Sequence, residues 1–458
     1  MSATAMIDEA VRRVAAFAEE ERLFRGAKRV LVAVSGGPDS IACLLILLGL
    51  RERFGFDVTV CHFDHKLRPD SAADLEFVRE LCAKLDVSCK TGEGDVRAVA
   101  TETKAGIEET ARQMRYQFLA FMAENAGADR IVTGHTLDDQ AETVLMRITR
   151  GSGVRGIRGM LPAGEVPGAS AQRLIRPLLV VRREETAAIC AEAGIVPLSD
   201  PSNDDRSFRR NLIRHETLPA LRLVNPLIED ALLRLAASAR EAFARTEKES
   251  FTAQPVAPLP IGVIFRTEVL AGLETEALSL VIEREAGFFS LRPEVNRTRL
   301  TNLRAALARG AGEVAFGDVL VELSCGSTRI GPRLETVVPF ESKVLNVPGA
   351  TAAGGWRVEV ATSPIPAAPG AALVVVDTSR QKGALRVRML QPGDRMHYRG
   401  MVRKVSDVLI NAKVPAWERR ELIAIADSGG VLAIVGASVD LRGKVAEEDA
   451  LWVRATRI

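Results

Sequence analysis

The sequence predicts an α/β fold with a doubly wound parallel sheet, followed by a helical middle domain and a small α+β C-terminal domain. Three observations carry this prediction. Short apolar runs alternate with longer helical patterns from residue 28 to about 197. Leucines at helical spacing follow from about 205 to 248, and a second helical stretch covers 267–310. After residue 312 the chain changes to short strands broken by glycine and proline.

The elements of the first part follow in a regular order. An amphipathic helix is expected over residues 5–24. Apolar, β-branched runs predict strands, and the patterns between them predict helices. The strands are expected at 29–34, 57–63 and 130–134, and the helices at 40–52, 71–85, 107–125 and 139–149. Such alternation gives a parallel sheet that binds ligands at the carboxyl ends of its strands. The glycine-rich segment 151–168 predicts a mobile loop.

Proline-rich segments indicate where the rest of the chain divides. Residues 255–260 predict a connector, and residues 364–369 predict a second seam within the part after residue 312. The last eighty residues alternate short strands with one clear helix at 404–412. We therefore expect three domains. They are 1–220 with the parallel sheet, a helical middle domain over 221–335, and a C-terminal domain over 336–458 with its core at about 385–458.

Composition excludes several classes of protein. The chain has 458 residues, 47% hydrophobic and 26% charged, which is typical of a soluble globular protein. Its six cysteines form no Cys-x-x-Cys pair, which argues against zinc, iron–sulfur and disulfide-framework proteins. The acidic N-terminal segment has no apolar signal core, and the longest apolar run, 41–50, is too short to span a bilayer. We expect a cytoplasmic protein with no membrane partner.

Charge is balanced overall, at a formal +2, but it is unevenly distributed. Residues 147–183 hold eight basic side chains against one acidic, and residues 381–458 hold fourteen against nine. Such local excesses suit a phosphate backbone, although a solvated charged surface explains either segment taken alone.

The most informative segment joins the first predicted strand to the next helix. It reads Ser35, Gly36, Gly37, Pro38, Asp39 and Ser40. Glycines at a strand-to-helix turn let backbone N–H groups close on an anion, and the helix adds its positive N-terminal dipole. The two serine hydroxyls can bond phosphate oxygens, and Asp39 can hold a Mg²⁺ ion on them. An ordinary capped Gly-Gly turn is the alternative, but six such residues in this context favour a nucleotide site.

Two other phosphate-binding motifs are excluded. No Gly-x-x-x-x-Gly-Lys-Ser/Thr occurs in the chain, so the site is not a kinase-type P-loop. Residues 151–156 match the dinucleotide pattern Gly-x-Gly-x-x-Gly, but a predicted helix rather than a strand leads into them. Because the βαβ context is missing, we reject a nicotinamide or flavin site.

A second polar cluster follows the predicted strand 130–134. His135, Asp139 and Glu142 are expected to converge there, since Asp139 and Glu142 are three residues apart on one helical face. Paired acids suit Mg²⁺ or a cationic substrate, and the histidine suits phosphate bonding or proton transfer. Asp138 is interpreted as the cap of the helix that follows.

Three more segments complete the candidate site. Arg112 and Arg115 lie on one predicted helix and could face the nucleotide or substrate, although a surface pair of Arg112 with Glu108 explains the first equally well. Residues 62–68 follow a strand, and their His65 is expected on the adenine side of the cleft. Residues 200–205 predict a turn that leads into a basic helix presenting Arg209, Arg210 and Arg214 to phosphates.

The residues 35–40 resemble the pyrophosphate loop, or PP-loop, of the N-type ATP pyrophosphatases, which adenylate a substrate and release pyrophosphate. Taken together, the segments resemble the tRNA(Ile)-lysidine synthetase family over nearly the whole chain, with 225–380 matching poorly. The carrying stretches are 35–40, 64–68, 106–116, 134–143, 150–160, 175–184, 200–214, 389–414 and 435–440. Pro38 departs from the small or β-branched residue usual there, but proline is tolerated in a first helical turn.

The resemblance implies a two-step reaction with ATP and Mg²⁺ as cofactors. ATP adenylates O2 of the wobble cytidine in a tRNA(Ile) with a CAU anticodon, and the ε-amine of L-lysine then attacks C2 and expels AMP. The loop 35–40 would hold pyrophosphate, Asp139 and Glu142 would attract lysine, and Arg112 or Arg115 would stabilise phosphate charge or bind the lysine carboxylate. The basic segments would hold the tRNA. The oligomeric state stays open, a homodimer included.

Three rival interpretations are weaker. A tRNA cytidine 2-thiolating enzyme calls for paired cysteines, and a glutamine-dependent amidotransferase calls for a glutaminase domain with a nucleophilic cysteine. Neither feature occurs in this sequence. A non-catalytic tRNA-binding protein would carry a vestigial loop, and the intact serines at 35 and 40 and acids at 39, 139 and 142 argue against such decay.

Overall fold

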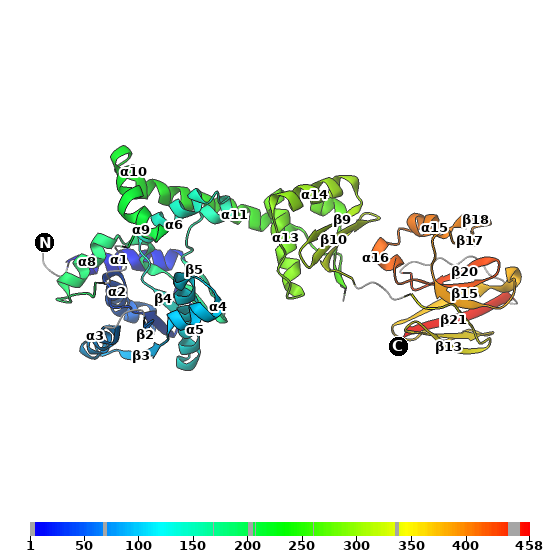
Figure 1. Ribbon diagram of the computed structural model, residues 1–458, viewed down its shortest axis with the longest axis horizontal. Helices are drawn as coiled ribbons and strands as arrows, with labels where there is room; N and C mark the ends of the chain where they lie inside the picture. Colours follow the sequence, from blue (N-terminus) through cyan, green and yellow to red (C-terminus); the bar gives the residue numbers. More distant parts are fainter. Residues whose placement is uncertain are drawn as a thin grey trace. The chain divides into compact units, whose positions relative to one another are not determined.

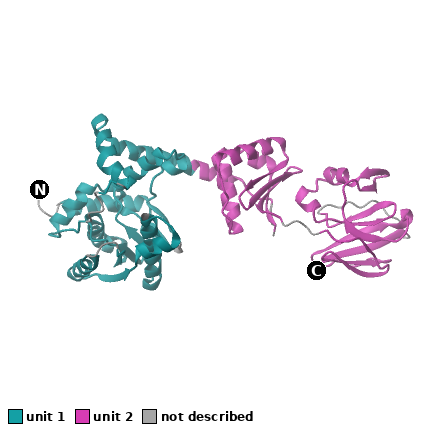
Figure 2. Ribbon diagram, in the orientation of Figure 1, with its two compact units in different colours: residues 1–244 teal, residues 245–458 magenta. Residues whose placement is uncertain are grey.

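The chain forms two compact units, residues 1–244 and residues 245–458 (Figures 1 and 2). The computed structural model describes residues 5–66, 71–167, 169–199, 205–206, 208–259, 261–334, 339–437 and 449–458. Within these residues no helix is long and apolar enough to cross a membrane.

Unit 1 is built on a six-stranded sheet with the strand order β3-β2-β1-β4-β6-β5. Every neighbouring pair is parallel except β5 with β6, which is antiparallel. The strands are β1 (Arg29–Ala33), β2 (Asp57–Asp64), β3 (Ser88–Glu93), β4 (Arg130–Thr133), β5 (Ala163–Val166) and β6 (Ala169–Ile175). The predicted parallel α/β sheet is therefore confirmed.

Helices cover both faces of this sheet (Figure 1). One face packs Val30, Val32 and Val132 against α1, α2, α3 and α8, and the other packs Leu31 and Ile131 against α5. Both sets of β1 side chains are thus buried, which explains the uninterrupted apolar run in the sequence. The helices are α1 (Ala5–Glu20), α2 (Pro38–Phe54), α3 (Ser71–Lys84), α4 (Val96–Thr103), α5 (Ile107–Ala126) and α8 (Arg183–Glu192).

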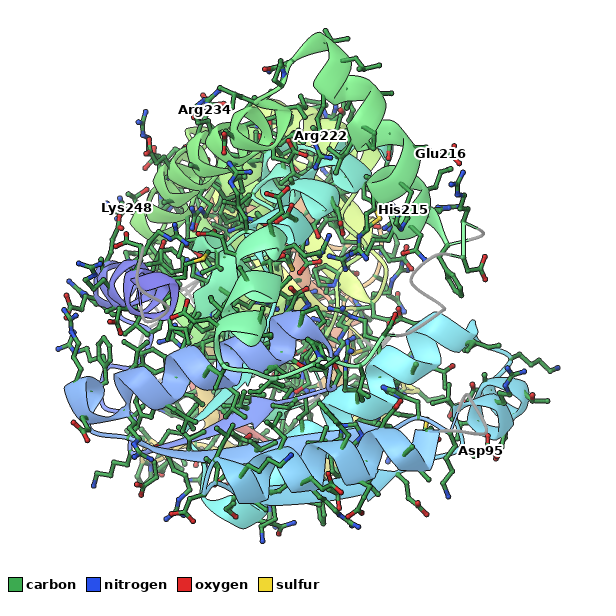
Figure 3. The ribbon with its side chains drawn as sticks, turned by 90° about the vertical axis from the view of Figure 1, so that its left-hand side faces the viewer. Asp95, His215, Glu216, Arg222, Arg234 and Lys248 are labelled. Carbon is green, nitrogen blue, oxygen red and sulfur yellow. The ribbon has the colours of Figure 1, made fainter. Side chains whose placement is uncertain are left out.

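A smaller helical layer completes unit 1. Helix α6 packs through Ala141 and Val144 on Ile213, Leu218 and Leu232 from the segments that follow residue 208. Arg222 lies on α10 (Leu218–Val224) and pairs with Glu229 of α11 (Ile228–Thr252) at 2.6 Å, and Arg234 lies on α11 as well (Figure 3). The elements are α6 (Leu137–Thr149), α7 (Val154–Ile157), a 3₁₀ turn (Pro177–Val180), α9 (Arg209–Leu212), a π-helical turn (Ile213–Thr217), α10 (Leu218–Val224) and α11 (Ile228–Thr252).

Unit 2 begins with helices on a five-stranded antiparallel sheet of order β7-β8-β11-β10-β9. Its core joins Phe265 and Val321 of the sheet to Leu278 and Leu303 of the helices. The elements are β7 (Ala257–Leu259), β8 (Gly262–Arg266), α12 (Thr267–Ala271), α13 (Thr275–Phe288), α14 (Arg297–Arg309), β9 (Gly312–Phe316), β10 (Val319–Ser324) and β11 (Ser327–Pro332).

The rest of unit 2 holds a six-stranded sheet and a four-stranded sheet, of orders β12-β16-β19-β20-β17-β18 and β13-β14-β21-β15. Side chains of both sheets share one core, which includes Val358, Val387 and Val453. The elements are β12 (Lys343–Val344), β13 (Gly349–Ala353), β14 (Trp356–Ala361), β15 (Ala371–Asp377), a 3₁₀ turn (Thr378–Arg380), β16 (Arg386–Met389), β17 (Arg395–Tyr398), β18 (Met401–Lys404), α15 (Val405–Asn411), α16 (Ala416–Arg419), β19 (Ile423–Asp427), β20 (Gly430–Val435) and β21 (Ala450–Arg457).

Three expectations about loops are wrong. The segment 151–168 forms α7 and β5, because Arg147 donates to the carbonyls of Gly156 and Gly159 at 2.6 and 2.7 Å and orders the turn. The predicted connector 255–260 contains β7, which pairs with β8. The prolines at 364–369 lie in the loop between β14 and β15, and because both strands pair with β21 in one sheet, this loop is not a seam between two parts. The three-domain division stays a prediction.

Candidate active site

The glycine loop lies between β1 and α2, as predicted. Gly37 is the N-cap of α2 and supplies no side-chain cap, so the first backbone N–H groups of the helix are left for a ligand. Gly36 has a φ of +88°, a conformation that costs glycine little. Pro38 stands in the first turn of α2, where its missing N–H costs nothing. This geometry is that of an anion-binding turn.

The two serines of the loop bond to each other. The backbone N–H of Ser35 donates to Ser40 Oγ at 3.1 Å, and Ser40 Oγ donates to the carbonyl of Gly37 at 2.9 Å. These bonds close the loop before any ligand arrives. Contact of either hydroxyl with a phosphate stays a prediction.

Gly134 brings the end of β4 against this loop. A Cβ on Gly134 would lie 2.7 Å from the backbone oxygen of Asp39 and 3.1 Å from the Cα of Ser40. Both neighbours are backbone atoms and cannot rotate away. The absence of a side chain at this position is what allows the loop after β4 to approach the PP-loop.

We expect Gly134→Ala to separate these loops. The clash should lower the free energy of unfolding by about 1–3 kcal/mol, and the displaced Asp39 should slow ATP–pyrophosphate exchange by roughly 100-fold. Gly164→Ala is the matched control, because its new Cβ meets nothing within 4 Å. Equal exchange rates in the two variants would show that this close approach is not needed.

The N-terminus of α6 corrects the role given to Asp138. Thr136 is the N-cap, and Asp139 completes a capping box by accepting the Thr136 N–H at 2.8 Å. Asp138 instead accepts the backbone N–H of Arg183 at 2.7 Å, so it binds the start of α8. The sequence could not show this, because the donor lies 45 residues away.

The three predicted acids meet at one point, around Arg183. Its Nη2 lies 2.7 Å from Asp139 Oδ1, its Nη1 lies 3.1 Å from Glu142 Oε1, and its Nε lies 3.5 Å from Asp39 Oδ2. Thr186, one turn along α8, donates to Asp39 Oδ1 at 2.5 Å. The structure thus brings Asp139 and Glu142 together, as expected, and it adds Asp39 to them, with a cation already between the three acids.

Arg210 and Arg214 also bind the acids. Arg210 Nε and Arg214 Nε lie 2.8 and 2.7 Å from the two oxygens of Glu142. In this structure both arginines thus bind carboxylates, and the expectation that they face phosphates stays a prediction. They bind Glu142 because its side chain is only 1% exposed, and a carboxylate so buried needs counter-charges. Arg214 stands in the π-helical turn, a local irregularity common at functional sites.

The acids differ in their ionisation. Burial raises the pKa of Asp39, although the hydrogen bond from Thr186 opposes that rise. Burial also acts to raise the pKa of Asp139 and Glu142, but Arg210 and Arg183 outweigh it at Asp139, and the Arg214 hydrogen bond helps to outweigh it at Glu142. Both of these pKa values are lowered, so the pair is ionised at neutral pH.

The two predicted histidines are neutral. Burial lowers the pKa of His135 to about 3 and that of His65 to about 4. His135 Nδ1 lies 2.8 Å from Thr133 Oγ1, and the His65 ring packs against the edge of Phe63. A neutral imidazole suits hydrogen bonding to a ligand rather than binding an anion by charge.

This ionisation predicts a pH effect on stability. The folded pKa of His65 lies below the ordinary 6.5, so the unfolded chain binds more protons between about pH 6.5 and 4, and stability falls as the pH is lowered through that window. When the pH is lowered from 7 to 5, the Tm of His65→Gln should therefore fall by less than the Tm of the parent chain. His397→Gln, an exposed position on β17, should match the parent. Identical losses in all three chains would contradict the assignment.

Arg112 and Arg115 both lie over the ring of Tyr116, at 5.0 and 5.6 Å from its centroid. Burial lowers the pKa of Arg115, and its charge lowers the pKa of both His65 and His135, which places Arg115 beside the site. No ion pair with a carboxylate is found for either arginine among the described side chains, which exclude that of Glu108. Their roles stay predictions.

The sequence did not mark two residues of the site, and some residues that it did mark are not among those the structure describes. Arg183 and Thr186 have no local pattern that marks them as site residues, and Arg183 stood out only as part of the basic segment 147–183 and of a stretch that resembles the family. The predicted turn 200–205 is described at its last residue alone, residues 67 and 68 are not described, and the closing run 435–440 is described to residue 437. Within the described residues, no group of three or more His, Cys, Asp or Glu side chains could hold a metal. A Mg²⁺ ion would therefore fit Asp39 only with phosphate oxygens as further ligands.

Comparison with known proteins agrees with this geometry. Residues 6–221 match the PP-loop domain family, and residues 385–455 match the TilS substrate C-terminal domain family. With its sheet and its glycine turn, the chain is thus a PP-loop protein of the ATP-using class.

Two full-length relatives identify the family. The chain is 30% identical to the tRNA(Ile)-lysidine synthase of Dehalococcoides mccartyi (strain CBDB1) over 95% of this chain and 96% of that one. It is 34% identical to the enzyme of the same name from Symbiobacterium thermophilum, over 94% of each. The chain belongs to the tRNA(Ile)-lysidine synthase family, and the resemblance found in the sequence is confirmed.

Proposed function

We propose that this chain ligates L-lysine to C2 of the wobble cytidine in a CAU-anticodon tRNA(Ile), using ATP and releasing AMP and pyrophosphate. One observation carries the proposal. The PP-loop and the acid pair Asp139 and Glu142 meet around Arg183, so a site for ATP phosphates adjoins a site for an amine. Both steps of the reaction need these two sites side by side.

In the first step O2 of the cytidine attacks the α-phosphorus of ATP, and pyrophosphate leaves. The free N–H groups at the start of α2 bind the pyrophosphate, and Asp39 is the residue that would hold a Mg²⁺ ion on the phosphates. That ion would neutralise charge as it develops. Arg115 stabilises the reacting phosphate, and neutral His65 and His135 serve as hydrogen-bonding partners for ATP.

In the second step the lysine ε-nitrogen attacks C2, a C–N bond forms, and the C2–O2 bond breaks to release AMP. Asp139 and Glu142 attract the amine. Three carboxylates face three arginines in this structure, with Asp39, Asp139 and Glu142 on one side and Arg183, Arg210 and Arg214 on the other. The amine therefore competes with arginine for the acids, and one arginine has to give way when lysine binds.

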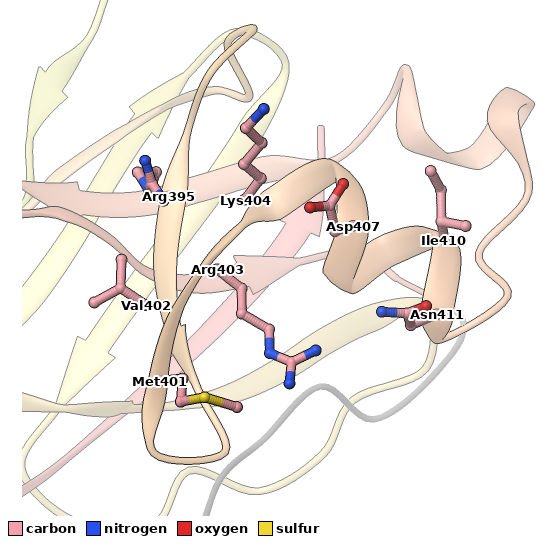
Figure 4. Close-up of a pocket in the computed structure, with 8 residues that line it drawn as sticks. All are labelled: Arg395, Met401, Val402, Arg403, Lys404, Asp407, Ile410 and Asn411. Atoms are coloured by element: carbon pink, nitrogen blue, oxygen red, sulfur yellow. The ribbon is translucent and has the colours of Figure 1, made fainter.

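The tRNA would contact the C-terminal basic segment. A pocket between the β17–β18 hairpin and α15 is lined by three cations, one acid and apolar side chains (Figure 4). The cations are Arg395, Arg403 and Lys404, the acid is Asp407, and Met401 and Ile410 are among the apolar side chains. Cations flanked by exposed apolar side chains suit a phosphate backbone and its nucleosides. We place the reaction in the cytoplasm, with its tRNA. A homodimer stays a prediction, to be tested by the mass in solution.

The test is incorporation of labelled lysine into a purified tRNA(Ile) (CAU) transcript with ATP and Mg²⁺. ATP-dependent label should appear with the parent chain and vanish with Asp39→Ala. No label from a folded chain that still consumes ATP would overturn the lysine step and point to another nucleophile on the adenylated cytidine. No ATP consumption at all would favour a tRNA-binding protein without catalysis.

A further inference from the structure

Arg183 is the only described side chain that forms ion pairs with carboxylates of both the PP-loop and α6. Its three nitrogens face three different acids, Asp39 at 3.5 Å, Asp139 at 2.7 Å and Glu142 at 3.1 Å. A planar guanidinium can bridge such acids at once, whereas a lysine ammonium is a single point charge.

The backbone of α8 fixes this arginine in place. The Arg183 N–H donates to Asp138 at the start of α6, and Thr186 in the same turn donates to Asp39 at 2.5 Å. Thr186 is completely buried. The first turn of α8 is therefore held to both halves of the site, and Arg183 is not a freely moving surface side chain.

The two halves depend on Arg183 to different degrees. Asp139 and Glu142 keep Arg210 and Arg214 as counter-ions if Arg183 moves away. Asp39 has no other cationic partner among the described side chains. Removing Arg183 should thus leave the acid pair paired with arginine, but it should break the one ionic link between that pair and the PP-loop.

We infer that Arg183 is a positioning residue that makes lysine binding depend on ATP. This rests on the proposed function. Phosphates bound at the PP-loop attract the guanidinium toward Asp39 and away from α6. The acid pair then faces two arginines instead of three and binds an ammonium group more tightly. By linkage, lysine tightens ATP binding by the same factor.

The experiment measures lysine binding by calorimetry, with and without a non-hydrolysable ATP analogue and Mg²⁺, and needs no tRNA and no turnover. In the parent chain the analogue should tighten lysine binding by about tenfold, within the usual range of such coupling. Arg183→Met should still bind the analogue and should still bind lysine, but the analogue should no longer tighten lysine binding, so that the ratio of the two lysine affinities falls to about one. Arg183→Lys keeps the charge without the bridging fork and should also lose most of the coupling.

Arg13→Met is the matched control. Arg13 pairs with Glu185 in the same first turn of α8, at 2.6 Å, but it does not contact the acids of the site. It should keep the parent coupling. A parent chain that binds lysine equally with and without the analogue, or an Arg183→Lys chain with the full factor, would overturn the inference and leave the proposed function standing. A parent chain that binds no lysine in either condition would overturn both.

Discussion

Glu142→Gln is expected to lower the free energy of unfolding by about 2–4 kcal/mol, near the cost of breaking a buried ion pair. Glu142 is 1% exposed and accepts from Arg183, Arg210 and Arg214. A glutamine of the same shape loses the charge and presents an N–H₂ group to three guanidinium groups. This loss is somewhat smaller than the roughly 3–5 kcal/mol usual for breaking a fully buried ion pair, because each of the three arginines is partly exposed to water.

The same change should slow lysine transfer by roughly 100-fold or more, because it removes one of the two carboxylates proposed to position the lysine amine. Chemical denaturation and the labelled-lysine assay measure the two effects. Glu216→Gln is the matched control, because Glu216 is 49% exposed at the surface (Figure 3) and pairs only weakly with exposed Arg206. It should change stability by less than about 0.5 kcal/mol. A Glu142→Gln chain as stable as this control would show that the cluster does not hold the helices together.

The nucleotide half of the site could be predicted from the sequence because it is local. Strand, glycine turn and helix lie within 29–54, and the apolar run 30–34 already indicates burial on both faces. The order of the motifs along the chain then placed Asp139 and Glu142 at the same edge of the sheet.

The arginines of the site could not be predicted in the same way. Arg183 and Arg214 meet Glu142 across 41 and 72 residues, and no local spacing encodes such a pair. Basic residues near a proposed phosphate site suggest phosphate contacts. In this structure they pair with Glu142 instead, because leaving a buried carboxylate unpaired costs more free energy than leaving a surface arginine unpaired.

One strand was missed for a clear physical reason. Strand β3 (Ser88–Glu93) reads Ser-Cys-Lys-Thr-Gly-Glu and lies at the edge of the sheet, with no fully buried residue. Such a strand is held by its backbone bonds to β2 rather than by apolar side chains. Periodicity in the sequence measures side-chain burial, and it therefore fails for a strand of this kind.

The second large effect is expected in unit 2, at Arg329. This side chain is fully buried in the sheet of β7–β11, and its Nε lies 2.7 Å from Oε2 of the nearly buried Glu322. It also donates to the carbonyls of Ile261 and Pro332. Arg329→Met should lower the free energy of unfolding by about 3–5 kcal/mol, because it leaves a buried carboxylate without its nearest counter-charge.

A double-mutant cycle separates charge from packing in this prediction. Glu322→Met combined with Arg329→Met removes both charges and should recover part of the loss, with a coupling energy of about 2 kcal/mol. Recovery should be incomplete for two reasons. The carbonyls of Ile261 and Pro332 still lack their donor, and Arg420 loses Glu322, its nearer partner at 2.9 Å, and keeps only Glu313 at 3.8 Å. If the double variant loses as much unfolding free energy as the two single variants together, or more, the ion pair does not stabilise this sheet. The arginine would then act through its packing alone.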